Sequence, residues 1–155
     1  MNLKNYTSSV PASTTIARIE GYLADCGVSG TTKEFSNGQP VALSFHIKLD
    51  GRDYTIRLPA NVEAVQTALY NDYMSSRTRP RETTTRESFL DQATKTAWKL
   101  QQDWVQVQMS LIKLNQVDFR QAFLAYFWDG EQTFYEQLQA SKFKQLPQST
   151  SNSQP

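Results

Sequence analysis

The chain has 155 residues, of which 39% are hydrophobic and 12% aromatic, so it is long enough to build one domain with a substantial core. Its formal net charge of +1 excludes a strong overall attraction to nucleic acid or to an acidic partner, so any such function must come from local clusters. One cysteine excludes an intramolecular disulfide, and no apolar run is long enough to span a bilayer, so we expect a cytoplasmic protein without a membrane segment.

The first half of the chain predicts one helix followed by a small antiparallel sheet. Apolar residues recur at helical spacing over about residues 14–26, and Gly27 then offers a left-handed helix terminator. Residues 41–58 alternate between apolar and polar side chains on both sides of an Asp-Gly pair at 50–51, which predicts a β-hairpin with one apolar face. Residues 28–35 are predicted to add a third strand.

The second half predicts several helices. Asn61 can cap a helix that ends near Ser75, and residues 76–86 form a polar connector without apolar side chains. A long helix is expected over residues 87–114, and its apolar stripe has the alternating four-and-three spacing of a heptad repeat. The stripe consists of Ala93, Ala97, Leu100, Trp104, Val107 and Leu111.

An aromatic helix is expected over residues 119–128, followed by a shorter helix around Phe134 and a disordered polar tail at 147–155. Together these elements predict an α+β fold in which a small antiparallel sheet packs with an N-terminal helix and a C-terminal helical half. We expect one domain over residues 1–146. The alternative is a pair of subdomains, 1–75 and 87–146, joined by the basic linker 76–86.

Several short segments share their order and spacing with a known family. They are Lys4-Asn5-Tyr6-Thr7, Val41-Ala42-Leu43-Ser44-Phe45, Ile56-Arg57-Leu58-Pro59, Gln92-Ala93 through Asp103-Trp104-Val105, and Phe123-Leu124-Ala125-Tyr126. In these segments the chain resembles a family of small uncharacterised proteins encoded by bacteriophages and prophage-like regions of bacterial genomes. The resemblance implies a mobile-element setting, but it supplies no activity and no site residues.

The sequence offers little for catalysis, metal binding or cofactor binding. His46 is the only histidine and lies on the polar face of the predicted hairpin, while Cys26 lies at the C-terminal end of the predicted first helix, where the helix dipole disfavours a thiolate. One cysteine and one histidine cannot form a structural zinc site, and Glu87 and Asp91 are typical of a solvated helix face. Phosphate-binding glycine motifs are absent from the sequence, so we expect a non-catalytic protein without a cofactor or metal.

The strongest local anomaly is a cluster of basic residues. Residues 77–99 hold six positive and three negative side chains, and arginine suits phosphate oxygens. The first hypothesis is therefore a non-catalytic nucleic-acid-binding accessory protein of a phage-like element, although a solvated connector would have the same composition. The predicted contacts are Arg77, Arg79, Arg81, Arg86, Lys95 and Lys99, with Lys48 and Arg57 from the hairpin.

The alternative hypothesis is a protein–protein interaction module, such as one that binds a host factor or an anti-defence target. The predicted aromatic helix carries large side chains in nearly every direction, more than a small monomer can cover. We therefore expect a partner surface and, most simply, a homodimer. The predicted partner contacts are Phe123, Tyr126, Phe127 and Trp128.

Overall fold

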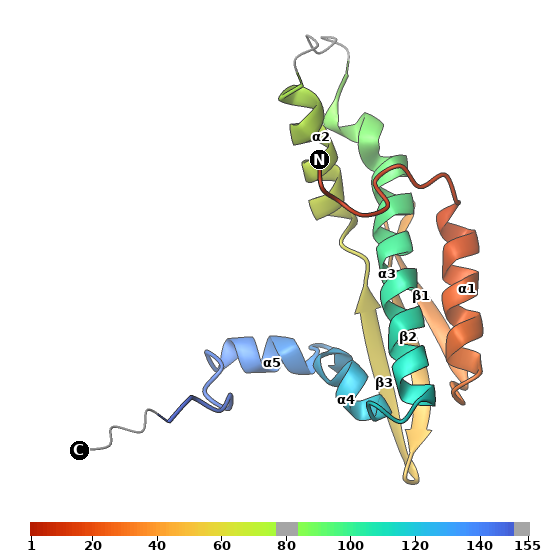
Figure 1. The fold of residues 1–155 in the computed structure, drawn as a ribbon, viewed down its shortest axis with the longest axis vertical. Coiled ribbons are helices and arrows are strands. Elements are labelled where there is room, and N and C mark those ends of the chain that lie inside the picture. The colour runs from red at the N-terminus through yellow and green to blue at the C-terminus, as the bar shows by residue number, and fades with distance from the viewer. Residues whose placement is uncertain (77–83, 151–155) are drawn as a thin grey trace.

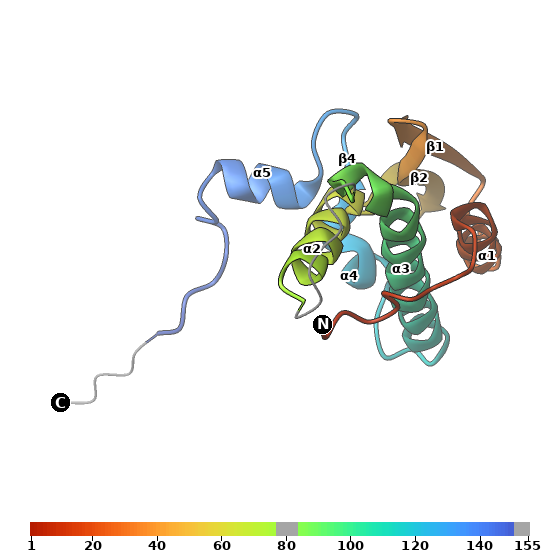
Figure 2. The same ribbon diagram turned by 90° about the horizontal axis from the view of Figure 1, so that it is seen from above.

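The computed structural model describes residues 1–76 and 84–150, and these residues have the predicted α+β fold. In chain order the elements are α1 (Ala12–Ala24), β1 (Gly30–Ser36), β2 (Gln39–Leu49), β3 (Arg52–Pro59), α2 (Val62–Met74), the 3₁₀ turn η1 (Arg86–Phe89), α3 (Leu90–Lys113), α4 (Phe119–Phe123), the 3₁₀ turn η2 (Leu124–Tyr126), β4 (Phe127–Trp128) and α5 (Phe134–Ala140). The strands form one antiparallel sheet in the order β1-β2-β3-β4. Figures 1 and 2 show α1 and α3 side by side over one face of this sheet.

Two tight turns determine how the first three strands pair. The φ angles of Asn37 and Gly38 are 50° and 74°, and those of Asp50 and Gly51 are 50° and 76°. Two-residue hairpin turns need positive φ at both central positions, and asparagine, aspartate and glycine adopt it at least cost. The predicted hairpin and third strand are therefore confirmed.

The alternation along β2 separates the two faces of the sheet. Phe45 and Ile47 are buried beneath the helices, and Phe45 lies opposite Ile56 of β3 in the register. His46 and Lys48 lie on the opposite face and are exposed. Burial of the apolar face under α1 and α3 is the main source of stability for this half of the fold.

Helix α3 joins the two halves of the chain. Trp98, on α3, is completely buried, and its indole N–H donates a hydrogen bond to the Pro40 carbonyl at 2.8 Å. Ile19 of α1, Phe45 of β2 and Val105 of α3 belong to one hydrophobic core. The two halves on either side of the connector therefore share a core.

The N-terminal residues cross the outer side of α3. The side chains of Lys4 and Asn5 both donate hydrogen bonds to the Asp103 carboxylate, Asn5 at 2.9 Å. The Gln92 side-chain amide donates to the Tyr6 carbonyl at 3.0 Å. Burial raises the pKa of Asp103, but the hydrogen bonds from Lys4 and Asn5, together with nearby lysine charges, outweigh burial and lower its pKa below the ordinary value.

The helix boundaries agree with their local signals. Gly27 follows α1 with φ of 87°, and the Val28 amide donates to the Leu23 carbonyl at 3.4 Å, as in a left-handed helix terminator. The Asn61 side chain caps α2 by accepting a hydrogen bond from the Ala64 amide at 3.1 Å.

The predicted aromatic helix over residues 119–128 is wrong in its second half. The helix α4 ends at Phe123, and after η2 the chain becomes extended as β4, where Phe127 lies opposite Ile56 of β3. This pairing satisfies backbone groups at the free edge of β3 and places the Phe127 ring 5.3 Å from that of Tyr54. A remote strand edge thus overrides the local helical pattern.

Candidate interaction surface

The predicted basic contacts on the sheet lie on its solvent-exposed face and are paired with carboxylates. Arg57 donates two hydrogen bonds to Glu34 of β1, from Nε at 3.1 Å and from Nη2 at 2.9 Å. The Lys48 ammonium lies 3.9 Å from the Asp53 carboxylate. Neighbouring carboxylates thus offset the positive charge on this face.

The predicted basic contacts on α3 lie in the helical layer, on the other side of the sheet from Lys48, and Arg86 of η1 lies at the end of the sheet. Lys95 Nζ lies 2.7 Å from the Asp91 carboxylate, and Lys99 Nζ lies 3.4 Å from that of Asp103. Arg86 Nη2 donates a hydrogen bond to Thr67 Oγ1 at 2.6 Å and lies 3.8 Å from the Glu63 carboxylate.

The remaining three predicted basic contacts, Arg77, Arg79 and Arg81, lie outside the described residues. The described five are spread over the exposed face of the sheet, the end of the sheet and α3, and each has an acidic partner. Within residues 1–76 and 84–150 they therefore do not assemble into one positive groove.

The four predicted partner-binding aromatics are mainly internal contacts. Phe123 is completely buried, and its ring packs edge-to-face with those of Phe45 and Trp104, at 5.7 and 5.5 Å. The Tyr126 ring packs 5.4 Å from that of Trp104. Trp128 is half-buried and is paired with Thr55 of β3, while Phe127 packs on Tyr54 as described above. These residues attach the end of the chain to the body.

Exposed apolar side chains occur at scattered positions such as Phe35 and Leu124, and three of them lie further along, in residues 129–146, which we call the C-terminal arm. Phe134 is 36% exposed and Tyr135 is 49% exposed, and both belong to α5. None of the seven residues of α5 is buried. Figures 1 and 2 show α5 projecting away from the sheet and from α3.

Local hydrogen bonds hold the start of α5. Thr133 and Glu136 form a capping box, in which Thr133 Oγ1 accepts from the Glu136 amide at 3.3 Å and Glu136 Oε2 accepts from the Thr133 amide at 2.7 Å. The Asp129 carboxylate accepts hydrogen bonds from the amides of Gln132 and Glu131, at 2.7 and 2.8 Å. These backbone hydrogen bonds lower the pKa of Asp129.

A second apolar surface lies on the C-terminal part of α3. Val107 is 55% exposed, Leu114 is 67% exposed, and Leu111 between them is half-buried. We call these three residues the α3 stripe. The sequence places Val107 in the same apolar stripe as Ala93 and Ala97, which are buried. The structure directs Trp98, Val105 and Met109 into the core and leaves Val107 and Leu114 of the α3 stripe exposed.

The sequence contains a local signal for each of these two surfaces. The Thr133-x-x-Glu136 pattern marks a helix start, so Phe134 and Tyr135 could have been placed on a separately capped helix. Leu114 continues the heptad spacing three residues beyond Leu111. Exposure itself could not have been read from either pattern.

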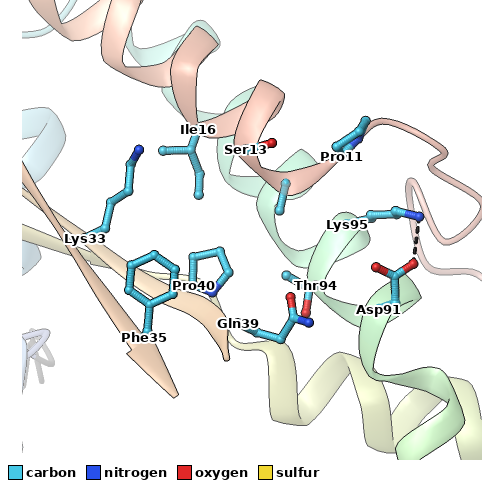
Figure 3. Close-up of a pocket in the computed structure, with 11 residues that line it drawn as sticks. Pro11, Ser13, Ile16, Lys33, Phe35, Gln39, Pro40, Asp91, Thr94 and Lys95 are labelled. Atoms are coloured by element: carbon cyan, nitrogen blue, oxygen red, sulfur yellow. Dashed lines mark ion pairs between the residues drawn. The ribbon is translucent and has the colours of Figure 1, made fainter. Parts of the chain in front are cut away.

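Two hollows open near the end of the sheet that carries the turn between β1 and β2. The first, of about 300 Å³, lies between α1, α3 and the β1–β2 hairpin, and Figure 3 shows Phe35 and Pro40 facing it together with Ile16. The ion pair of Lys95 with Asp91 lies at its rim. The second, of about 810 Å³, lies between α2 and the end of the sheet and has carboxylates at Glu34, Glu63 and Glu87 as well as Arg86.

Cys26 and His46 have separate partners. Cys26 Sγ lies 3.1 Å from the Met109 sulfur, and burial raises the pKa of this thiol. His46 Nδ1 lies 2.9 Å from Thr55 Oγ1 on the exposed face of the sheet. Across residues 1–76 and 84–150, no three histidine, cysteine, aspartate or glutamate side chains group as metal ligands would. The same residues include no helix able to cross a membrane.

Comparison with protein families, curated proteins and solved structures finds no match to this chain. The resemblance to phage-encoded proteins therefore stays a prediction. Some segments that carry it make contacts within the fold, since Lys4 and Asn5 bind Asp103 and Phe123 packs in the core. Packing within the fold is therefore enough to account for these residues, without any binding role.

Proposed function

We propose that this chain is a non-catalytic protein–protein interaction module whose binding surface is the C-terminal arm. The observation that carries the proposal is the state of α5: it is a formed and capped helix with no buried residue and with Phe134 and Tyr135 exposed. The sequence also led to an interaction hypothesis, but the proposed partner contacts now lie in the arm and not at residues 123–128.

The physical reason is that a seven-residue helix is too short to be stable on its own. Isolated helices below about 12–15 residues are marginal in water, and protein helices owe most of their stability to burial of an apolar face. The capping box supports only the first turn of α5. A partner that covers Phe134 and Tyr135 would supply the missing burial.

The chemistry of the exposed side chains also fits protein recognition. Tyrosine and phenylalanine bury a large area with few rotatable bonds, and aromatic residues are enriched at interfaces. Leu138 lies one turn after Phe134 on the same side of α5 and is half-buried. Such short apolar helices are a recurrent way to engage a groove on another protein.

A photo-crosslinking experiment tests this function. We would place p-benzoylphenylalanine at Tyr135 in the full chain and, as the matched control, at Tyr6, which is 43% exposed against 49% for Tyr135. Irradiation in the producing cell should give a defined adduct from position 135 and none of comparable yield from position 6. No adduct, or the same adducts from both positions, would contradict the proposal.

Nucleic-acid binding is the competing function, and the arginine-rich connector is the observation in its favour. Arg77, Arg79, Arg81 and Arg86 fall within ten residues, and Glu82 is the one acidic residue between them. On this hypothesis the affinity for single- or double-stranded oligonucleotides should fall steeply with salt concentration. Replacing Arg77, Arg79 and Arg81 with glutamine should then weaken binding and flatten the salt dependence. Absent or salt-insensitive binding would eliminate it.

A further inference from the structure

We propose that the partner of the C-terminal arm is a second copy of this chain, with α5 of each copy packed on the α3 stripe of the other. This inference rests on the proposed interaction function and names its partner. The two surfaces that it joins are Phe134 and Tyr135 of one copy and Val107, Leu111 and Leu114 of the other.

The α3 stripe has the spacing that a partner helix requires. Starting at Ala93, apolar residues continue at intervals of four and three through Leu114, the pattern by which one helix packs along another. The chain covers the first part of this series itself, since Ala93 and Ala97 are buried and the Trp104 ring packs against that of Phe123. From Val107 onward the series is exposed or half-buried. The apolar series typical of a helix–helix contact thus continues past the part of α3 that other elements of the same chain cover.

The arm of the same copy is not placed to cover the α3 stripe. In Figure 1, α5 runs outward from α4, in the direction away from α3, and Figure 2 shows the same separation from above. Trp128 and Thr133 fix the start of the arm, because Trp128 pairs with Thr55 of β3 and with Thr133. An arm that leaves the body in this direction can reach the stripe of a neighbouring copy.

Interface size favours a second copy over an unrelated protein. A stable interface buries about 800 Å² on each partner, and a full aromatic side chain contributes roughly 150–250 Å². Phe134 and Tyr135, which are 36% and 49% exposed, fall well short of that area alone, as does the α3 stripe. In a two-fold symmetric pair each surface is used twice, because the contact of arm with stripe occurs in both directions. Two arm-to-stripe contacts therefore bury twice the area of one, without using any additional surface of the chain.

The charges beside the two surfaces are also compatible with this contact. Lys113 is exposed at the end of α3, next to the α3 stripe, and Glu131 is exposed at the start of the arm. Neither side chain has an ion-pair partner among residues 1–76 and 84–150. This one opposite pair favours encounter between copies, whereas Lys142 and Lys144 further along the arm are exposed and carry the same sign as Lys113.

The test measures the mass of the purified full chain by light scattering over a range of concentrations. The wild-type protein should have twice the mass of one chain. Tyr135→Glu in the arm and Leu114→Glu in the stripe should each weaken the dimer by more than about thirtyfold, because a charge replaces a buried anchor. Met74→Glu is the matched control, since Met74 is 47% exposed on α2, and it should remain dimeric. Circular dichroism checks that each variant is folded.

A mixing experiment distinguishes this arrangement from other dimers. Tyr135→Glu retains an intact stripe and Leu114→Glu retains an intact arm, so a mixture should form a heterodimer through one of its two contacts. It should therefore be weaker than the wild-type dimer but detectable where each variant alone is monomeric. A wild-type monomer up to the solubility limit, a dimer that survives either substitution, or a mixture that stays monomeric would overturn the inference.

Failure of this inference differs from failure of the proposed function. If the wild-type chain is monomeric but position 135 crosslinks to a different protein, the arm is an interaction surface and its partner is not a second copy. If the chain is monomeric and position 135 gives no adduct, both proposals fail. An adduct with the mass of two chains supports both.

Discussion

The body of this protein, by which we mean the described residues up to 128, and its C-terminal arm are stabilised in different ways. The body is stabilised by packing between residues that are distant in sequence, such as Phe45 of β2 and Trp98 of α3, which are both completely buried. In the arm, the contacts of Asp129 and of the Thr133 capping box reach only a few residues along the chain, and α5 buries none of its side chains. The comparison shows that long-range packing stabilises the body, and on our proposal the arm gains its missing burial from another surface.

The largest expected difference comes from one substitution made in each region. Phe45→Ala should lower the free energy of unfolding by about 3–5 kcal/mol, because it leaves a cavity among Phe119, Phe123 and the helices. Phe134→Ala should change it by less than about 1 kcal/mol, because this residue is 36% exposed and α5 contains no buried residue. Chemical denaturation at low protein concentration measures both. Similar losses at the two positions would abolish the distinction between body and arm.

A smaller effect is expected where the N-terminal residues are attached to α3. Asp103→Asn should cost about 1–2 kcal/mol, because it weakens the hydrogen bonds from Lys4 and Asn5. The folded-state pKa of Asp103 is lowered, so its contribution is present above the ordinary aspartate pKa of about 3.9 and is lost as the pH falls through the lower folded value. Unfolding curves of the two proteins should therefore converge at low pH. A difference that stays constant with pH would contradict this account.

The cap of α5 should matter locally and not globally. Thr133→Ala removes the hydroxyl that accepts from the Glu136 amide, which typically costs a helix about 1 kcal/mol. Amide hydrogen exchange should accelerate within residues 134–140, while the denaturation midpoint of the body stays unchanged. Asn61→Ala provides the matched comparison in the body, because the loss of that α2 cap should lower global stability. A global loss from Thr133→Ala would show that the arm and the body unfold together.

The smallest effect is a titration within the arm. Protonation of Asp129 should weaken the hydrogen bonds that its carboxylate accepts from Glu131 and Gln132. Because these bonds lower its pKa, the amide NMR signals of both residues should shift with a midpoint below the ordinary aspartate value. A midpoint at or above that value would mean that the start of the arm is not ordered in solution.

Local signals in the sequence were sufficient for much of the fold. The Asp-Gly pair at 50–51 and the alternation around it predicted the hairpin, because this turn needs positive φ at both positions. Asn61 predicted the start of α2 through its capping side chain. The candidate site was harder to predict, because it depends on which apolar residues the rest of the chain leaves exposed.

What the sequence by itself determined was the set of elements whose causes lie within a few residues: α1 and its glycine terminator, the hairpin turn at 50–51 and the capped α2. Only the tertiary structure decided that Phe127 joins β3 instead of a helix, that Arg57 is neutralised by Glu34, and that Val107 is exposed while Val105 is buried. The physical reason is that turns and caps are short-range preferences of the backbone, whereas strand pairing, charge pairing and burial depend on partners that are distant in sequence. The arm combines both, since its helix is specified locally and its exposure is decided by the packing of the whole chain.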